Sequence, residues 1–73
     1  MKTLDAIKFC FTKDAYEAAE SFNSPYQVLK MACLRAFRHG YGDWPETSPH
    51  FQATQQLRKA LTAFEETGIL IEE

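Results

Sequence analysis

The longest hydrophobic pattern in the chain is a helical repeat between Ser48 and Gly68. Its apolar residues recur every three or four positions and fall on one face: Ala53, Leu57, Ala60, Leu61 and Phe64. Ser48 and Pro49 suit the N-cap and the first helical position, and Gly68 suits the left-handed conformation that ends many helices. Residues 69–71, which read Ile-Leu-Ile, have strand character. The pattern predicts a long helix and a short strand, with the rest of the chain packed against the apolar face of the helix.

A second helix is predicted from Pro25 to about His39. Ser24 and Pro25 repeat the same start signal, and Gly40 is placed to end the helix. One broad face is apolar: Val28, Leu29, Ala32, Cys33, Ala36 and Phe37. The opposite face carries Gln27, Lys30, Arg35 and Arg38, and it also includes Met31 and Leu34.

The first twelve residues show a shorter alternation. Ile7, Phe9 and Phe11 occupy every second position, which is typical of a strand. A helix with Leu4, Ile7 and Phe11 on one face is the competing interpretation, but it leaves Phe9 off the apolar stripe. We therefore predict a strand here.

A short helix is predicted to follow from Asp14. Asp14 and Glu17 fit a capping box, in which each side chain bonds a free backbone N–H of the other residue. The helix is expected to end before Pro25, because proline cannot continue the hydrogen-bond ladder. Its inner face would be Ala15, Ala18, Ala19 and Phe22.

These elements predict a mainly helical α+β domain of three helices, with short strands at the N- and C-termini. The two strands are expected to pair as a ribbon on the helices, and a three-helix bundle with extended ends is the alternative. A chain of 73 residues forms one domain at most. Its apolar share of 45% is that of a globular protein rather than a disordered one.

Composition and charge indicate where the protein is located and which classes of partner it binds. No apolar run approaches the roughly 20 residues of a membrane span, and Asp5 and Lys8 interrupt any signal-peptide core. We therefore expect a cytoplasmic protein with Cys10 and Cys33 as reduced thiols. The net charge of −2 argues against general nucleic-acid binding, but the charges are unevenly spread. Residues 24–62 carry five basic and two acidic side chains, whereas residues 63–73 carry four acidic and no basic ones.

The sequence contains no recognisable pattern of catalytic, cofactor-binding or metal-binding residues. Gly40 and Gly42 do not form a nucleotide-binding loop, and His39 and His50 lack the spacing of zinc ligands. A chain this short also has little room for a small-molecule pocket of about 300 Å³ or more. We expect no enzymatic activity, no cofactor and no metal site.

Two groups of residues indicate docking on another protein. On the second helix, Met31 and Leu34 lie among the basic residues Lys30, Arg35 and Arg38. In the loop of residues 40–47, Tyr41 and Trp44 belong to residue types enriched at interfaces. Aromatic side chains of a small domain also fold back over its core, which is the alternative for this pair. A homodimer that buries the same exposed residues is a further alternative.

Residues 56–73 resemble the recognition helix and first wing strand of winged-helix regulators. The matching positions are Leu57, Arg58, Ala60, Leu61, Phe64, Gly68, Ile69 and Ile71. The resemblance implies a truncated winged-helix variant of the fold and a surface that faces DNA. That surface comprises Gln52, Gln55, Arg58, Lys59 and Thr62, whose types read base edges or hold phosphates. The loop of residues 40–47 is longer than the helix-turn-helix turn of about 3–4 residues.

The sequence therefore predicts a small non-enzymatic regulator or inhibitor that acts inside the cell by docking on another protein. Compact chains of this kind are common among accessory proteins of phages and mobile elements. A DNA-binding regulator of the winged-helix type is the alternative.

Overall fold

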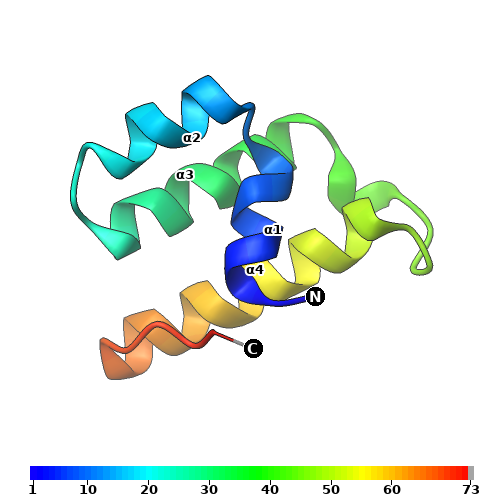
Figure 1. Cartoon of the computed structure of the whole chain (residues 1–73). Helices are drawn as coiled ribbons and strands as arrows, with labels where there is room; N and C mark the ends of the chain where they lie inside the picture. The colour runs from blue at the N-terminus through cyan, green and yellow to red at the C-terminus, as the bar shows by residue number, and fades with distance from the viewer. Residues whose placement is uncertain (73) are drawn as a thin grey trace.

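Residues 1–72, which the computed structural model describes, form four α-helices and one short 3₁₀-helix (Figure 1). Their bounds are α1 Thr3–Cys10, α2 Lys13–Glu20, α3 Pro25–Arg38, η1 Tyr41–Asp43 and α4 Pro49–Thr67. Helices α3 and α4 pack together, α1 packs on both of them, and α2 lies on α3. Helix α4 is therefore the centre of the fold, since α1, α3 and η1 all contact it.

The starts and stops predicted for the two long helices are confirmed. The Ser24 hydroxyl accepts a hydrogen bond from the Gln27 N–H at 3.3 Å, and Pro25 is the first residue of α3. The Ser48 hydroxyl likewise accepts from the His50 N–H at 3.1 Å at the start of α4. Gly40 and Gly68 have φ values of 70° and 73°, the left-handed conformation that glycine adopts without strain.

The predicted strand at the N-terminus is wrong, because residues 3–10 form helix α1. The residues that α1 buries are spaced three and four apart: Thr3, Ala6, Ile7 and Cys10. Phe9 does lie off this stripe, as the sequence indicated, and it is 37% exposed. The apolar stripe is therefore completed by the small residues Ala6 and Cys10, and the alternation of large residues over five positions was misleading.

The predicted strand at the C-terminus is also wrong, and so is the α+β fold class. Residues 69–72 follow α4 as an irregular tail, and no strand occurs among residues 1–72. The tail does return towards the N-terminus (Figure 1), where Leu70 packs near Leu4 and Ile7. A strand needs a partner for its backbone groups, and α1 uses its own backbone groups within the helix. The truncated winged-helix variant fails for the same reason, because it requires a strand after Gly68.

The capping box predicted for Asp14 and Glu17 is not formed. Helix α2 begins one residue earlier, and the Thr12 hydroxyl caps it by accepting from the Ala15 N–H at 3.2 Å. Only Ala19 of α2 is buried, and Phe22, which was predicted to face inward, is 60% exposed.

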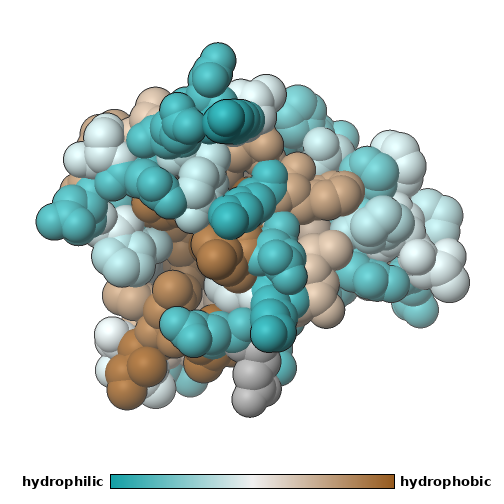
Figure 2. Space-filling model, viewed as in Figure 1, coloured by the Kyte–Doolittle hydropathy of each residue, from teal (hydrophilic) through white to brown (hydrophobic). Residues whose placement is uncertain are grey.

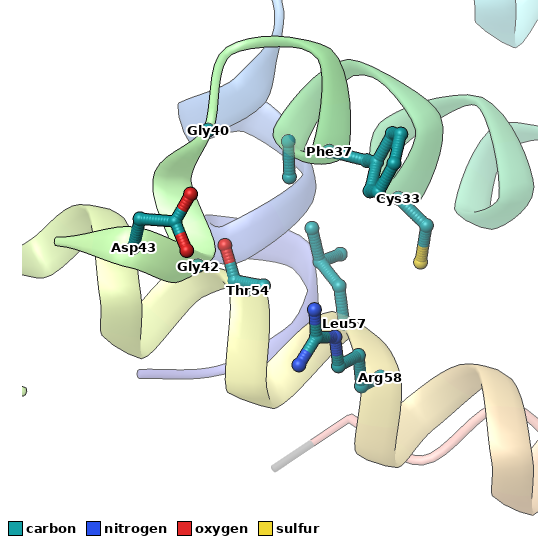
Figure 3. A pocket seen from close by; sticks show the side chains of 9 residues that line it. Cys33, Phe37, Gly40, Gly42, Asp43, Thr54, Leu57 and Arg58 are labelled. Atoms are coloured by element: carbon teal, nitrogen blue, oxygen red, sulfur yellow. The ribbon is translucent and has the colours of Figure 1, made fainter.

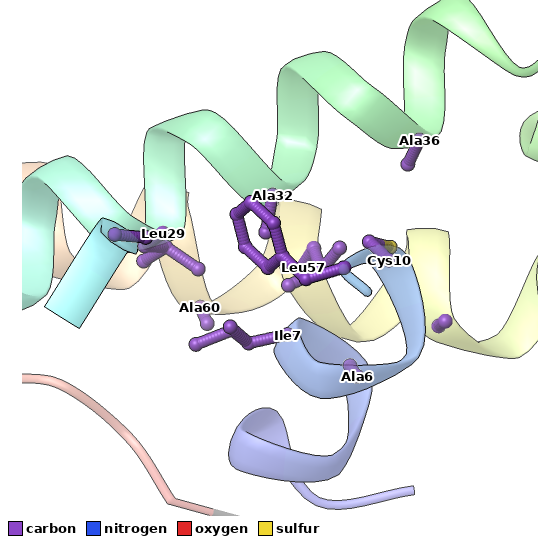
Figure 4. Close-up of a cluster of buried hydrophobic side chains, with 11 residues drawn as sticks. Ala6, Ile7, Cys10, Leu29, Ala32, Ala36, Leu57 and Ala60 are labelled. Atoms are coloured by element: carbon purple, nitrogen blue, oxygen red, sulfur yellow. The ribbon is translucent and has the colours of Figure 1, made fainter. Parts of the chain in front are cut away.

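Small side chains dominate the core (Figure 4). Of the eleven buried apolar residues found among residues 1–72, six are alanines: Ala6, Ala19, Ala32, Ala36, Ala53 and Ala60. Alanine lets helix backbones approach closely, so the larger Ile7, Phe11, Leu29 and Leu57 fill the space that remains. Leu57, at the middle of α4, has no exposed surface.

Two side-chain contacts fix how the helices cross. The rings of Tyr26 and Phe64 stack with centroids 5.2 Å apart, which joins the start of α3 to the end of α4. These two helices are therefore antiparallel. The Gln56 side-chain amide donates to the Thr3 hydroxyl at 2.9 Å and ties α1 to the middle of α4.

Truncation of Ile7 and Phe9 to alanine tests whether α1 is a helix. We expect Ile7→Ala to cost about 3 kcal/mol of unfolding free energy, because it leaves a cavity under a nearly buried side chain. Phe9→Ala should cost only about 1 kcal/mol, since that ring makes edge contacts near the surface. Urea denaturation followed by circular dichroism measures both. Equal losses would indicate a strand that buries both residues on one face.

Candidate functional site

The outward side of α3 carries large apolar residues that no other element covers. Leu34 is 49% exposed and Phe37 is 77% exposed, the highest value among the large apolar residues of the described chain. Lys30 and Arg38 are exposed beside them. Helix α3 has no acidic residue. We call Lys30, Leu34, Phe37 and Arg38 the α3 outer face.

A shallow apolar hollow of about 480 Å³ extends from this face towards α4. Met31 and Cys33 of α3 and Leu61 of α4 line it together with Leu34. Met31 is half-buried and packs against the core, so it contributes less surface than the sequence indicated. Phe37 was predicted to face the core and instead lies at the surface.

The partly buried Arg35 side chain packs against α1 and its following residue. Its Nε donates to the carbonyl oxygen of Cys10 at 2.9 Å, and its guanidinium lies 5.1 Å from the centre of the Phe11 ring. Cys10 is the last residue of α1, where carbonyl groups lack helical partners and a positive charge is favourable. Arg35 therefore joins the end of α1 to α3. Unlike the exposed Lys30 and Arg38, it is not part of the α3 outer face.

Tyr41 and Trp44 belong to a cluster of rings around His50. The His50 ring stacks on Trp44 with centroids 3.8 Å apart, and it meets the edges of Tyr41 and Phe9 at 4.8 and 5.0 Å. His39 stacks on the other side of Tyr41 at 5.3 Å. Tyr41 is half-buried in this cluster, whereas Trp44 stays 45% exposed.

The role of His50 was missed at the level of sequence. Ser48 was identified as a cap, and the same hydroxyl lies 3.0 Å from His50 Nδ1. The cap therefore orients the imidazole two residues later and holds it against the loop. The sequence did contain a signal for this role, because His50 directly follows the Ser-Pro helix start and comes after two aromatic residues in the loop.

The five residues proposed to contact DNA are all exposed on α4: Gln52, Gln55, Arg58, Lys59 and Thr62. Part of this surface forms an open hollow that Glu46 and Phe51 also line. Glu66 lies one turn beyond Thr62 and is exposed as well. Arg35 does not extend this surface, because it is bonded to α1.

A more enclosed pocket of about 350 Å³ lies where α3, η1 and α4 meet (Figure 3). Its walls combine apolar and polar side chains, with Phe37 and Leu57 beside Asp43, Thr54 and Arg58. The Thr54 hydroxyl donates to the carbonyl oxygen of His50 at 3.1 Å. This volume reaches the size of small-molecule sites, although the chain length had indicated little room for one.

Both cysteines are free thiols. The pKa of Cys10 is raised to about 11, chiefly by burial; the neighbouring Cys33 contributes to the rise and Arg35 opposes it. Burial also raises the pKa of Cys33, and the positive charge of Arg58 offsets only part of this rise. Within residues 1–72, no group of three or more His, Cys, Asp or Glu side chains is arranged to hold a metal ion.

No family model matches the chain, and comparisons with curated proteins and with solved structures give no significant match. None of the helices in the described part of the chain is both long and apolar enough to cross a membrane.

The two thiols should differ in reactivity in the folded protein. We expect iodoacetamide at about pH 8 to modify the half-buried Cys33 well before Cys10, which is 4% exposed. The thiolate is the reactive form, and a pKa of about 11 leaves roughly one Cys10 in a thousand ionised at that pH. Peptide mass spectrometry quantifies each site. In denaturant both should react at similar rates, and equal native rates would contradict the burial of Cys10.

Proposed function

We propose that this protein is a non-enzymatic regulator or inhibitor that docks on another protein through the α3 outer face. The observation that supports this most is the exposure of Leu34 and Phe37 on a helix that carries only basic charges. Large apolar side chains next to one another on a small surface are typical of interaction sites. A central apolar pair with a charged rim is also the usual arrangement of a binding hot spot.

The partner is expected to present an apolar surface with acidic residues around it. Lys30 and Arg38 flank Leu34 one helical turn away on either side. An acidic rim would complement them, speed association and exclude basic partners. A symmetric homodimer through this face would instead place Lys30 and Arg38 close to their own copies, which like-charge repulsion disfavours.

The double substitution Leu34→Asp/Phe37→Asp should abolish docking without unfolding the protein, because both side chains are exposed. Proteins captured from a lysate of the source cells by wild type and by the variant are compared by mass spectrometry. We expect an acidic protein that wild type captures to be lost with the variant, and to be captured less by Lys30→Glu/Arg38→Glu.

The matched control for this test is Phe22→Asp, which changes another exposed aromatic residue on a different part of the molecule. It should leave capture unchanged. Identical partners for wild type and the Leu34/Phe37 variant would rule out this face, and sedimentation that shows a dimer dissociated by the same variant would replace the partner with a second copy.

A second proposal is that the protein binds duplex DNA along α4. The common exposure of Gln52, Gln55, Arg58, Lys59 and Thr62 on one helix supports it. Their side chains have the hydrogen-bonding groups that contact base edges and phosphates. Glu46 and Glu66 beside them oppose it, because they would repel the phosphates.

DNA binding predicts a steep dependence on salt, because phosphate contacts release counterions. Fluorescence anisotropy with a labelled duplex should show affinity that falls as salt rises, and Arg58→Ala/Lys59→Ala should weaken binding at least about tenfold at low salt. Lys8→Ala/Lys13→Ala removes the same charge from a different hollow, beside α2, and serves as the control. Absence of duplex binding at low salt would exclude this function.

A further inference from the structure

The pocket between α3, η1 and α4 is lined by two opposite charges that have no partner among residues 1–72. Asp43 of η1 and Arg58 of α4 both line it (Figure 3). Among residues 1–72, neither side chain forms an ion pair within 4.0 Å. Two charged groups that face one cavity without contacting each other leave room for a ligand that contacts both.

The glycine next to Asp43 lies close to the Arg58 guanidinium. A Cβ atom on Gly42 would lie 3.4 Å from Arg58 Nη2 and 3.7 Å from Thr54 Cγ2. Gly42 does not have the positive φ that would require glycine for the backbone, unlike Gly40 and Gly68. The Arg58 guanidinium therefore lies against η1 at the edge of the pocket, within van der Waals range of position 42.

Besides Asp43, Arg58 and Thr54, the side chains that line the pocket are apolar or a thiol. Ala36 and Leu57 are almost fully buried behind it, and the ring of Phe37 borders its mouth. Cys33 adds a thiol whose raised pKa keeps it neutral, so it does not repel an anion beside Arg58. The pocket volume of about 350 Å³ is at the small end of the range for ligand sites.

We propose that this pocket binds an α-amino acid group with an apolar side chain, either as a free amino acid or as the C-terminal residue of a peptide. The Arg58 guanidinium would hold the carboxylate by paired hydrogen bonds, which its planar geometry favours. The Asp43 carboxylate would accept from the ammonium or amide N–H on the adjacent carbon. The side chain of the ligand would pack on Phe37 and Cys33, which line the pocket and have accessible surface. The site goes beyond the docking proposed for the α3 outer face, with which it shares only Phe37.

Titration of the ¹⁵N-labelled protein with phenylalanine, N-acetylphenylalanine and phenylalanine amide tests this site. In ¹H–¹⁵N NMR spectra, we expect phenylalanine and N-acetylphenylalanine, which both carry a carboxylate, to shift the signals of Gly40, Gly42 and the Arg58 side chain. Phenylalanine amide, which lacks the carboxylate, should shift none of them at about 10 mM, a concentration that fills a millimolar site. The peptide Gly-Gly-Phe and its amidated form distinguish the two sources of the ligand, since tighter binding by the peptide indicates a chain terminus.

Variants assign the roles of the two charges. Arg58→Gln should weaken binding of every carboxylate at least about tenfold. Asp43→Asn should affect phenylalanine more than N-acetylphenylalanine, because only the former carries an ammonium group. Lys59→Gln, which removes a neighbouring charge outside the pocket, should leave binding unchanged. Equal binding of amide and carboxylate, shifts elsewhere in the protein, or no effect of Arg58→Gln would overturn the proposal.

Discussion

The close approach of the helices, which the core alanines allow, is the constraint on which the rest of the structure depends. Ala53 and Ala60 let α1 and α3 lie near the backbone of α4, on either side of Leu57. Ala32 and Ala36 do the same on α3. A core of this kind is thin, because six of its eleven side chains among residues 1–72 are single methyl groups. Enlarging one of these side chains would push two helices apart, and a well-packed core resists such a change.

The thin core explains why so many large apolar residues lie outside it. Phe9 finds partners in Tyr41 and His50, so its exposure is offset by ring contacts. The tail residues gather over one end of the molecule, where Figure 2 shows apolar side chains at the lower left of the face in view. Leu34 and Phe37 have no such cover, and the exposed basic residues Lys30 and Arg38 lie beside them. The shape of the core and the proposed docking surface therefore have the same physical origin.

The sequence predicted the ends of the two long helices, which depend on local chemistry. Ser24, Ser48, Gly40 and Gly68 act through their own backbone or nearest neighbours, and helix bounds set by them are correct. The sequence-based prediction failed where the structure depends on contacts with residues far away in the chain. Residues 69–71 would need a strand beside them, and Arg35 was assigned to the surface because its partner, the Cys10 carbonyl, lies 25 residues away in the sequence. The pocket between α3, η1 and α4 was unforeseen for the same reason, since its two charges come from different elements.

Helix α2 is attached to the rest of the molecule far more weakly than the other helices. It contributes one buried side chain, Ala19, and it packs chiefly on α3. The turn that follows it holds Asn23 at a φ of 53°, a left-handed conformation that asparagine adopts more readily than most residues other than glycine. Opening of α2 would expose little buried surface and leave the α1–α3–α4 core in place. Such local opening would occur without global unfolding, so backbone amides of α2 would exchange with solvent hydrogen long before those around Leu57.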